Sequence, residues 1–160
     1  MISFRRDHRV VTLMLFSTVI TIALLVFALQ ARFSVVDISS AKISIPINEG
    51  DDVVHSYTHS MYKASVNEQF IIDDSRFHLM NVNTDSIAVL EYFGLNNKDV
   101  SHLNLFFDSF TIPSSSVGAH RLKIKGAEID LGTGEERDGK VYIRIRKTGL
   151  IEYLKILIWG

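Results

Sequence analysis

The chain has 160 residues, of which 47% are hydrophobic and 22% are charged, and its formal net charge is −1. This length fits one folded domain plus an N-terminal extension, and the near-zero charge argues against a nucleic-acid-binding protein, which normally carries a basic excess. The sequence contains no cysteine. Disulfides, thiolate metal sites and cysteine nucleophiles are therefore excluded.

An uninterrupted apolar segment, VVTLMLFSTVITIALLVFAL, occupies residues 10–29. Twenty helical residues at about 1.5 Å each span about 30 Å, which is the thickness of the hydrocarbon core of a bilayer. Arg5, Arg6 and Arg9 precede the segment, whereas only Arg32 follows it closely. By the positive-inside rule, we expect a cytoplasmic N-terminus and a C-terminal part on the outer side of the cell membrane.

Two interpretations of this segment stay open, an uncleaved anchor and a cleaved signal peptide. The apolar region of a signal peptide normally has about 7–15 residues, fewer than here, and the best cleavage candidate, LQA at 29–31, has one of its two small residues. We therefore expect a cytoplasmic tail at 1–9, a single-pass anchor in the lipid bilayer at 10–31, and a short tether at 32–41.

Short strand patterns dominate residues 42–160, the expected extracytoplasmic domain. Gly, Asn, Asp and Ser separate most of these runs, as turns require. The last run, 150–159, is apolar but too short to span a bilayer, so it is predicted to be a core strand. Strands at this spacing predict an all-β domain, an antiparallel sandwich or small barrel. The predicted strands are 42–47, 53–62, 66–72, 76–82, 104–112, 120–126, 127–131, 140–147 and 150–159.

One segment departs from the strand pattern. DSIAVLEYFGL at 85–95 fits a short helix that is capped by Asp85 or Ser86 and ended by Gly94, and it also fits a buried strand. We favour a helix over 85–92.

The segment SYTHSMYKASVNEQF at 56–70 is predicted to be a hairpin with a two-residue turn at 63–64. This register places His59 opposite Glu68, with Tyr57 on the same, mostly apolar face. Burying either member of the pair alone would cost several kcal/mol, so each protects the other. The turn sequence Lys-Ala lacks the Gly or Asn that two-residue turns favour, and a longer loop would shift the register.

The His59–Glu68 pair has two interpretations. It is either a structural hydrogen bond of the hairpin, or a ligand or proton site that also uses Tyr57 and the adjacent Ser60. A carboxylate beside an imidazole favours the imidazolium, so a pH-sensitive contact is conceivable. Ser60 points to the opposite face of the strand from His59, so the two are not a catalytic dyad.

Metal, cofactor and catalytic signatures are weak in this sequence. His55 and His59 are four residues apart, which on a strand is about 13 Å and too far for one metal ion. His78, His102 and His120 are isolated and are predicted to be surface or cap residues. No serine lies in a GxSxG pattern. We expect no enzyme activity, no metal and no cofactor.

The pattern YxHS followed by VxExF, between residues 57 and 70, resembles the H-S…V-x-E core of the domain of unknown function 1850 family. The block AVLEYFGL at 88–95 resembles the second block of that family, and the resemblance covers residues 42–126 together with the N-terminal membrane segment. MYK at 61–63 and Ser65 depart from the usual pattern of the family.

The resemblance implies a small exported or membrane-anchored protein, often encoded beside TRAP-type transporters of the TAXI class. We therefore expect a membrane-anchored accessory or partner-binding domain that contacts the membrane subunits of a transporter. The alternative is an exported domain that binds a small molecule or ion through His59 and Glu68.

Overall fold

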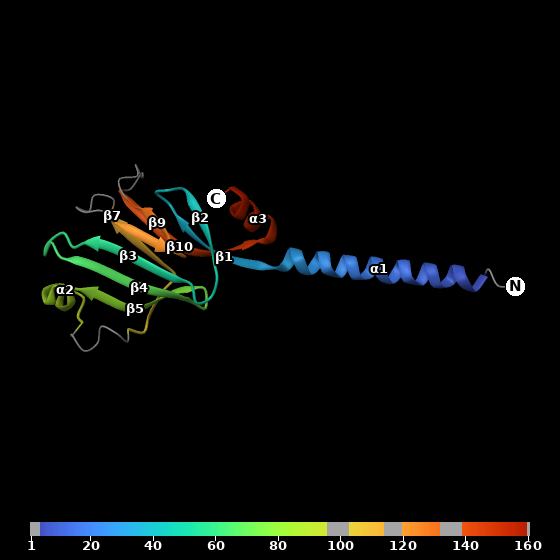
Figure 1. The fold of residues 1–160 in the computed structure, drawn as a ribbon, viewed down its shortest axis with the longest axis horizontal. Coiled ribbons are helices and arrows are strands. Elements are labelled where there is room, and N and C mark those ends of the chain that lie inside the picture. The colour runs from blue at the N-terminus through green and yellow to red at the C-terminus, as the bar shows by residue number, and fades with distance from the viewer. Residues whose placement is uncertain (1–3, 96–102, 114–119, 132–138, 160) are drawn as a thin grey trace.

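The computed structural model describes residues 4–95, 103–113, 120–131 and 139–159. Its first element, α1 (Phe4–Gln30), projects from a β domain that contains the other described elements (Figure 1). Residues Val10–Gln30 of α1 form a helix that is long and apolar enough to cross a membrane, and none of it is buried in the domain. The Arg32 guanidinium donates to the carbonyl oxygens of Leu29, Gln30 and Ala31 at the end of this helix.

The expected tether at 32–41 is not a linker, because its first part is the strand β1 (Arg32–Ile38). The β-branched run that contains Val35, Val36 and Ile38 is buried in the core, and burial of these side chains favours a strand over a flexible link. One residue, Ala31, therefore separates the membrane-length helix from the first strand of the domain.

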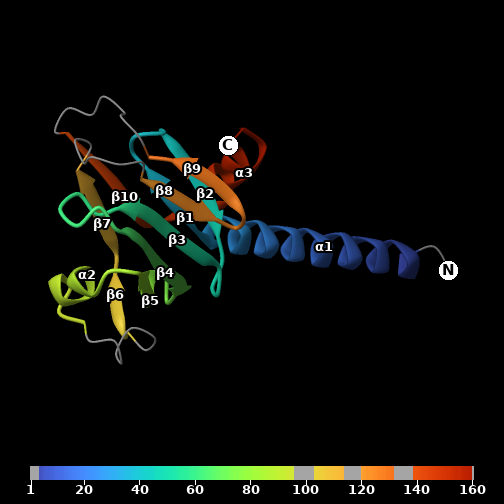
Figure 2. The ribbon, with the colours of Figure 1, turned by 60° about the vertical axis from the view of Figure 1, so that its left-hand side comes forward.

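The domain consists of two antiparallel sheets that pack as a sandwich, as the sequence predicts (Figures 1 and 2). The four-stranded sheet has the order β2 (Ile43–Ile47), β1, β10 (Lys140–Gly149), β7 (Ser109–Pro113). The six-stranded sheet has the order β6 (Leu105–Phe107), β5 (Arg76–Thr84), β4 (Ser65–Asp73), β3 (Asp52–Thr58), β8 (Arg121–Ile124), β9 (Ala127–Asp130).

The predicted strand 104–112 is two strands, interrupted at Asp108. β6 pairs with β5 in one sheet, whereas β7 pairs with β10 in the other, so the chain crosses between the layers at this residue. The Asp108 carbonyl accepts a hydrogen bond of 3.2 Å from the Ile145 backbone N–H, which ties the crossing to β10.

The core lies between the two sheets and contains an aromatic cluster of Phe70, Phe77 and Phe110. Phe77 is fully buried, and its ring packs edge-on against both others, at 6.0 Å from Phe70 and 5.1 Å from Phe110. Because β4 and β5 belong to one sheet and β7 to the other, this cluster joins the layers.

The helix expected at 85–92 is present as α2 (Ile87–Tyr92). Ser86 is its N-cap residue but makes no side-chain capping bond. Gly94, with φ +70°, ends it as expected, because the N–H of Gly94 bonds to the Glu91 carbonyl and the N–H of Leu95 bonds to the Leu90 carbonyl.

The predicted core strand at 150–159 is wrong, because this segment is the helix α3 (Leu150–Trp159) and none of its residues is buried. Leu150, Tyr153 and Ile156 are its partly covered residues, and a spacing of three places them on one side of a helix. The Thr148 hydroxyl donates to the Glu152 carboxylate at 2.6 Å in the first turn. This bond and the helical spacing favour a helix over a continuation of strand β10.

Candidate functional site

The β3–β4 hairpin has a longer turn than the sequence suggests, and this changes the partner of Glu68. Thr58 pairs with Ser65, and the N–H of His59 bonds to the Ala64 carbonyl at 2.8 Å. In this register His55, not His59, lies opposite Glu68. The predicted His59–Glu68 pair is therefore wrong, because Lys63-Ala64 does not form a two-residue turn.

Glu68 accepts hydrogen bonds from two residues of β3. Its Oε2 lies 2.9 Å from Nδ1 of His55, and its Oε1 accepts a bond of 3.1 Å from the Tyr57 hydroxyl. His55 is 4% exposed, and the Glu68 side chain is 17% exposed. Both carboxylate oxygens are thus fixed by neighbours in a largely water-excluded position.

His120 extends this chain of contacts and lies just before β8. Its Nδ1 lies 3.1 Å from Nε2 of His55, and its ring stacks on Tyr57 at 5.1 Å between centroids. The expectation that His120 is a surface or cap residue is wrong, because the pairing of β3 with β8 brings it against His55. We call Tyr57, Glu68, His55 and His120 the Glu68 network.

The hydrogen positions in the network are linked. If neutral His55 donates from Nδ1 to Glu68, its Nε2 can only accept, so Nδ1 of His120 must donate to it. If His55 is protonated at both nitrogens, Nε2 donates and Nδ1 of His120 accepts. One proton added at His55 therefore reverses the hydrogen-bonding role of His120.

The other predicted site residues lie apart from Glu68. His59 is half-buried in the turn, where its ring contacts Tyr62 and meets Tyr92 edge-on at 5.2 Å. Ser60 is exposed in the same turn. Of the four predicted residues, the fold brings together Tyr57 and Glu68, and it adds two histidines that the hairpin interpretation missed. His102 lies outside the described residues.

The Glu68 network lines one part of a pocket of about 530 Å³. The pocket lies between β7 of one sheet and β3 to β6 of the other, and α2 contributes to its wall. Figures 1 and 2 place α2 at the end of the domain opposite α1. The described side chains that complete the wall are predominantly apolar: Phe70, Leu79, Val82, Tyr92, Phe93, Leu95, Leu103, Leu105, Phe107, Phe110, Thr111, Ile112 and Pro113.

The environment shifts the pKa of two network members. Burial and the negative charge of Glu68 raise the pKa of Tyr57 far above its usual value, so its hydroxyl stays a hydrogen-bond donor. Burial lowers the pKa of His120, with a smaller contribution from His55, and Glu68 opposes this shift. The neutral form of His120 is therefore favoured in the folded protein.

This shift predicts how the stability contributed by His120 depends on pH. Its pKa is lower in the folded than in the unfolded chain, so below the ordinary value of 6.5 the unfolded chain takes up the proton first. The stabilisation is complete above that pH and decreases as the pH falls toward the folded pKa. We expect the difference in unfolding free energy between the parent chain and His120→Gln to decrease on acidification, measured by urea unfolding at several pH values. A difference that is independent of pH would contradict the shift.

The chain shows no match to a protein-family model, to a curated protein or to a solved structure.

Proposed function

We propose that this chain is a membrane-anchored domain that binds a small amphipathic molecule in the pocket lined by the Glu68 network. The observation that carries the proposal is a largely buried carboxylate and two histidines, linked by hydrogen bonds, in the wall of an otherwise apolar pocket. Ligand sites typically combine an apolar lining with a few convergent polar groups. We place the domain on the outer side of the cell membrane, anchored by α1. The three arginines that precede the apolar span support this orientation, because positively charged residues favour the cytoplasmic side.

The chemistry of the pocket favours a ligand whose polar end donates hydrogen bonds. Glu68 is the carboxylate among the described lining residues, and each of its oxygens can accept a further bond. The rings of Tyr92, Phe93 and Phe107 present aromatic surface to the same space. Aromatic faces attract cations, most strongly where water is excluded. An organic ammonium group on an apolar body fits both features.

We propose binding without chemical turnover. The sequence has no cysteine and no serine in a GxSxG pattern. The hydrogen bonds among Tyr57, Glu68, His55 and His120 hold these side chains in place. This leaves Glu68 and the histidines as recognition groups.

A matched pair of probes tests the ligand class. We expect an alkylamine to raise the melting temperature of the full chain in micelles, whereas the carboxylate of equal chain length has no effect, because Glu68 repels an anion. Leu105→Asn should lower the apparent affinity for the alkylamine at least tenfold, because Leu105 lines the pocket and is 48% exposed. Met61→Asn is the control, because Met61 is 68% exposed on the hairpin turn and does not line the pocket. Equal stabilisation by both probes, or an equal effect of both variants, would refute the proposal.

A second candidate is an accessory domain for a TRAP-type transporter. The resemblance to the domain of unknown function 1850 family supports it, and so does the start of β1 directly after α1, which holds the domain close to the bilayer. Affinity purification from gently solubilised membranes should then recover transporter membrane subunits. Repeated recovery of the chain alone would count against this function.

A further inference from the structure

The helix α3 exposes apolar side chains at the end of the domain where α1 emerges. Ile151, Leu154 and Ile158 are 64%, 45% and 72% exposed. Their spacing of three and four residues places them in one stripe along the helix. Leu157 and Trp159 add exposed apolar surface, at 56% and 86%. The fold of the domain leaves this stripe in contact with water, and exposed apolar surface of this extent marks a site that contacts a partner or a membrane.

The position of α3 is fixed relative to α1. Arg32, which follows α1, pairs with Gly149, which precedes α3. Leu29 in the last turn of α1 and Ile151 in the first turn of α3 line the same surface hollow. Figures 1 and 2 both show α3 at the end of the domain from which α1 leaves. If the apolar span ending at Gln30 crosses a bilayer, α3 begins at the level of the bilayer surface.

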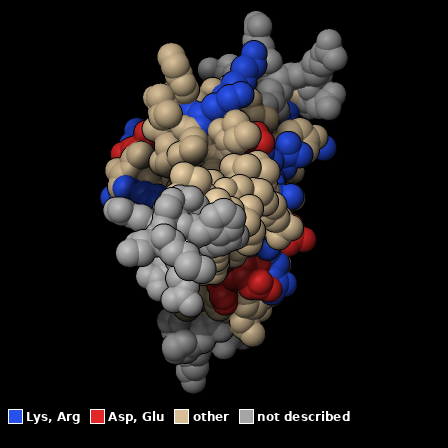
Figure 3. Space-filling model, turned by 90° about the vertical axis from the view of Figure 1, so that its right-hand side faces the viewer, with Lys and Arg blue, Asp and Glu red and all other residues tan. Residues whose placement is uncertain are grey.

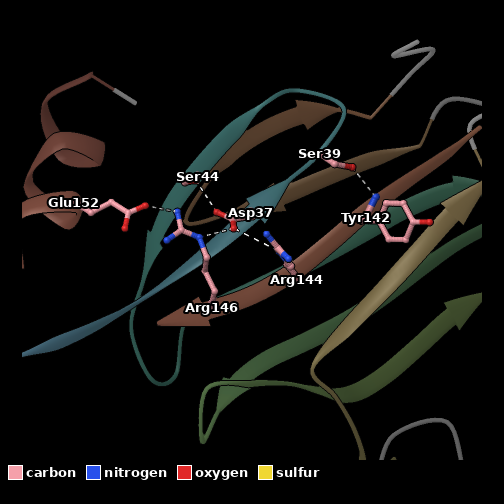
Figure 4. A network of polar contacts seen from close by, with 7 residues as sticks. All are labelled: Asp37, Ser39, Ser44, Tyr142, Arg144, Arg146 and Glu152. Carbon is pink, nitrogen blue, oxygen red and sulfur yellow. Dashed lines mark hydrogen bonds and ion pairs between the residues drawn. The ribbon is translucent and has the colours of Figure 1, made fainter. Parts of the chain in front are cut away.

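Polar contacts hold α3 in this position on the outer side of β10. Arg146 bonds to Asp37 on β1 and, at 2.8 Å, to Glu152 on α3 (Figure 4). Hydrogen bonds from Thr148 and Arg146 lower the pKa of Glu152, which therefore stays charged and paired. Phe33 on β1 stacks on Tyr153 at 4.3 Å. These contacts occupy the other sides of α3 and leave the stripe facing outward.

We propose that α3 is an interfacial helix whose stripe of Ile151, Leu154 and Ile158 inserts into the outer leaflet beside α1. Helices of this kind bury their apolar face about 5–10 Å into the boundary between headgroups and acyl chains. Lys155 lies beside the stripe, where its long side chain can reach the headgroups. Figure 3, which views the face from which α1 projects, shows uncharged side chains on this face together with Lys and Arg groups at several places.

This contact would give the domain a second attachment to the membrane. One helix that crosses a bilayer leaves the attached domain able to tilt and rotate, whereas two contacts fix its orientation. The pocket, on the α2 side at the opposite end of the domain, would then point away from the lipid. The inference rests on the proposed anchoring by α1.

The absence of native cysteine permits a direct test with single nitroxide labels on the full chain in phosphatidylcholine vesicles. Ile158→Cys reports on α3, Leu25→Cys on the apolar span of α1, and Ser60→Cys on the exposed hairpin turn of the domain. We expect collisions with oxygen, which concentrates in lipid, to exceed collisions with a water-soluble nickel complex severalfold at positions 25 and 158. The ratio should be reversed at position 60, which also shows that the label does not itself enter lipid.

The three labels separate the failure of each proposal. Lipid exposure at position 25 with water exposure at 158 would overturn the interfacial helix and leave the anchor. Water exposure at position 25 would overturn both. A label at 158 that is shielded from oxygen and from nickel would assign the stripe to a protein partner instead. Adding Leu154→Asp to Ile158→Cys should move the label into water, because the substitution places a charge in the stripe. An unchanged ratio of oxygen to nickel collisions would contradict insertion.

Discussion

Phe77→Ala is expected to lower the free energy of unfolding by about 3–5 kcal/mol, the range for truncating a buried phenylalanine. Phe77 is fully buried and packs edge-on against Phe70 and Phe110, which belong to opposite sheets. The variant removes the ring between the layers and leaves a cavity that the sheets can fill only by shifting. Urea unfolding of the full chain in micelles measures the loss.

Phe107→Ala is the matched control, because Phe107 pairs with Phe77 across β5 and β6 but is 37% exposed. Its truncation removes an equal ring from a half-exposed site, so the loss should be less than half as large. Equal losses for the two variants would mean that the layers do not depend on the aromatic cluster. Because Phe70 and Phe110 also line the pocket, Phe77→Ala should weaken ligand binding as well.

The sequence predicts strands well wherever apolar and polar residues alternate. β3, β4 and β5 lie within a few residues of their predicted bounds, because alternation reflects a half-buried strand directly. It carries no information on which strands share a sheet. The segment 104–112 therefore looks like one strand, although Asp108 sends its two halves to different layers.

The error at 150–159 has a different cause. A dense apolar run predicts burial in the core, yet α3 has no buried residue. Apolar composition indicates that a segment avoids water, but it does not distinguish the protein interior from lipid or a partner. The spacing of three between Leu150, Tyr153 and Ile156, which the structure shows on one side of α3, is the feature of the sequence that could have identified a helix.

The site was predicted in part for a similar reason. Alternation assigns His55, Tyr57 and His59 to one face of the strand, but the length of the turn decides which of them meets Glu68. His120 lies 65 residues from its contact with His55. Its place in the network depends on the pairing of β3 with β8, which no local pattern encodes.

Glu68→Ala is expected to lower the free energy of unfolding by about 2–4 kcal/mol. The variant removes the acceptor of both the Tyr57 hydroxyl and His55, and His55 is 4% exposed, so water cannot readily replace the lost bond. Glu68→Gln should cost less. Its amide oxygen still accepts one bond, and its amide group can donate to Nδ1 of His55 if that ring adopts the other tautomer and donates to His120 instead.

Glu128→Ala provides the comparison, because Glu128 also belongs to a cross-strand ion pair. It lies 3.2 Å from Arg121, but both side chains are more than half exposed, so the expected loss is within about 1 kcal/mol. Urea unfolding of the full chain measures all three variants. If Glu68→Ala cost no more than Glu128→Ala, the buried network would not be held by its carboxylate. A large loss of unfolding free energy for Glu68→Ala with a small loss for Glu68→Gln would instead show that hydrogen bonding, rather than charge, maintains the network. The alkylamine experiment on Glu68→Gln then measures what the negative charge contributes to binding.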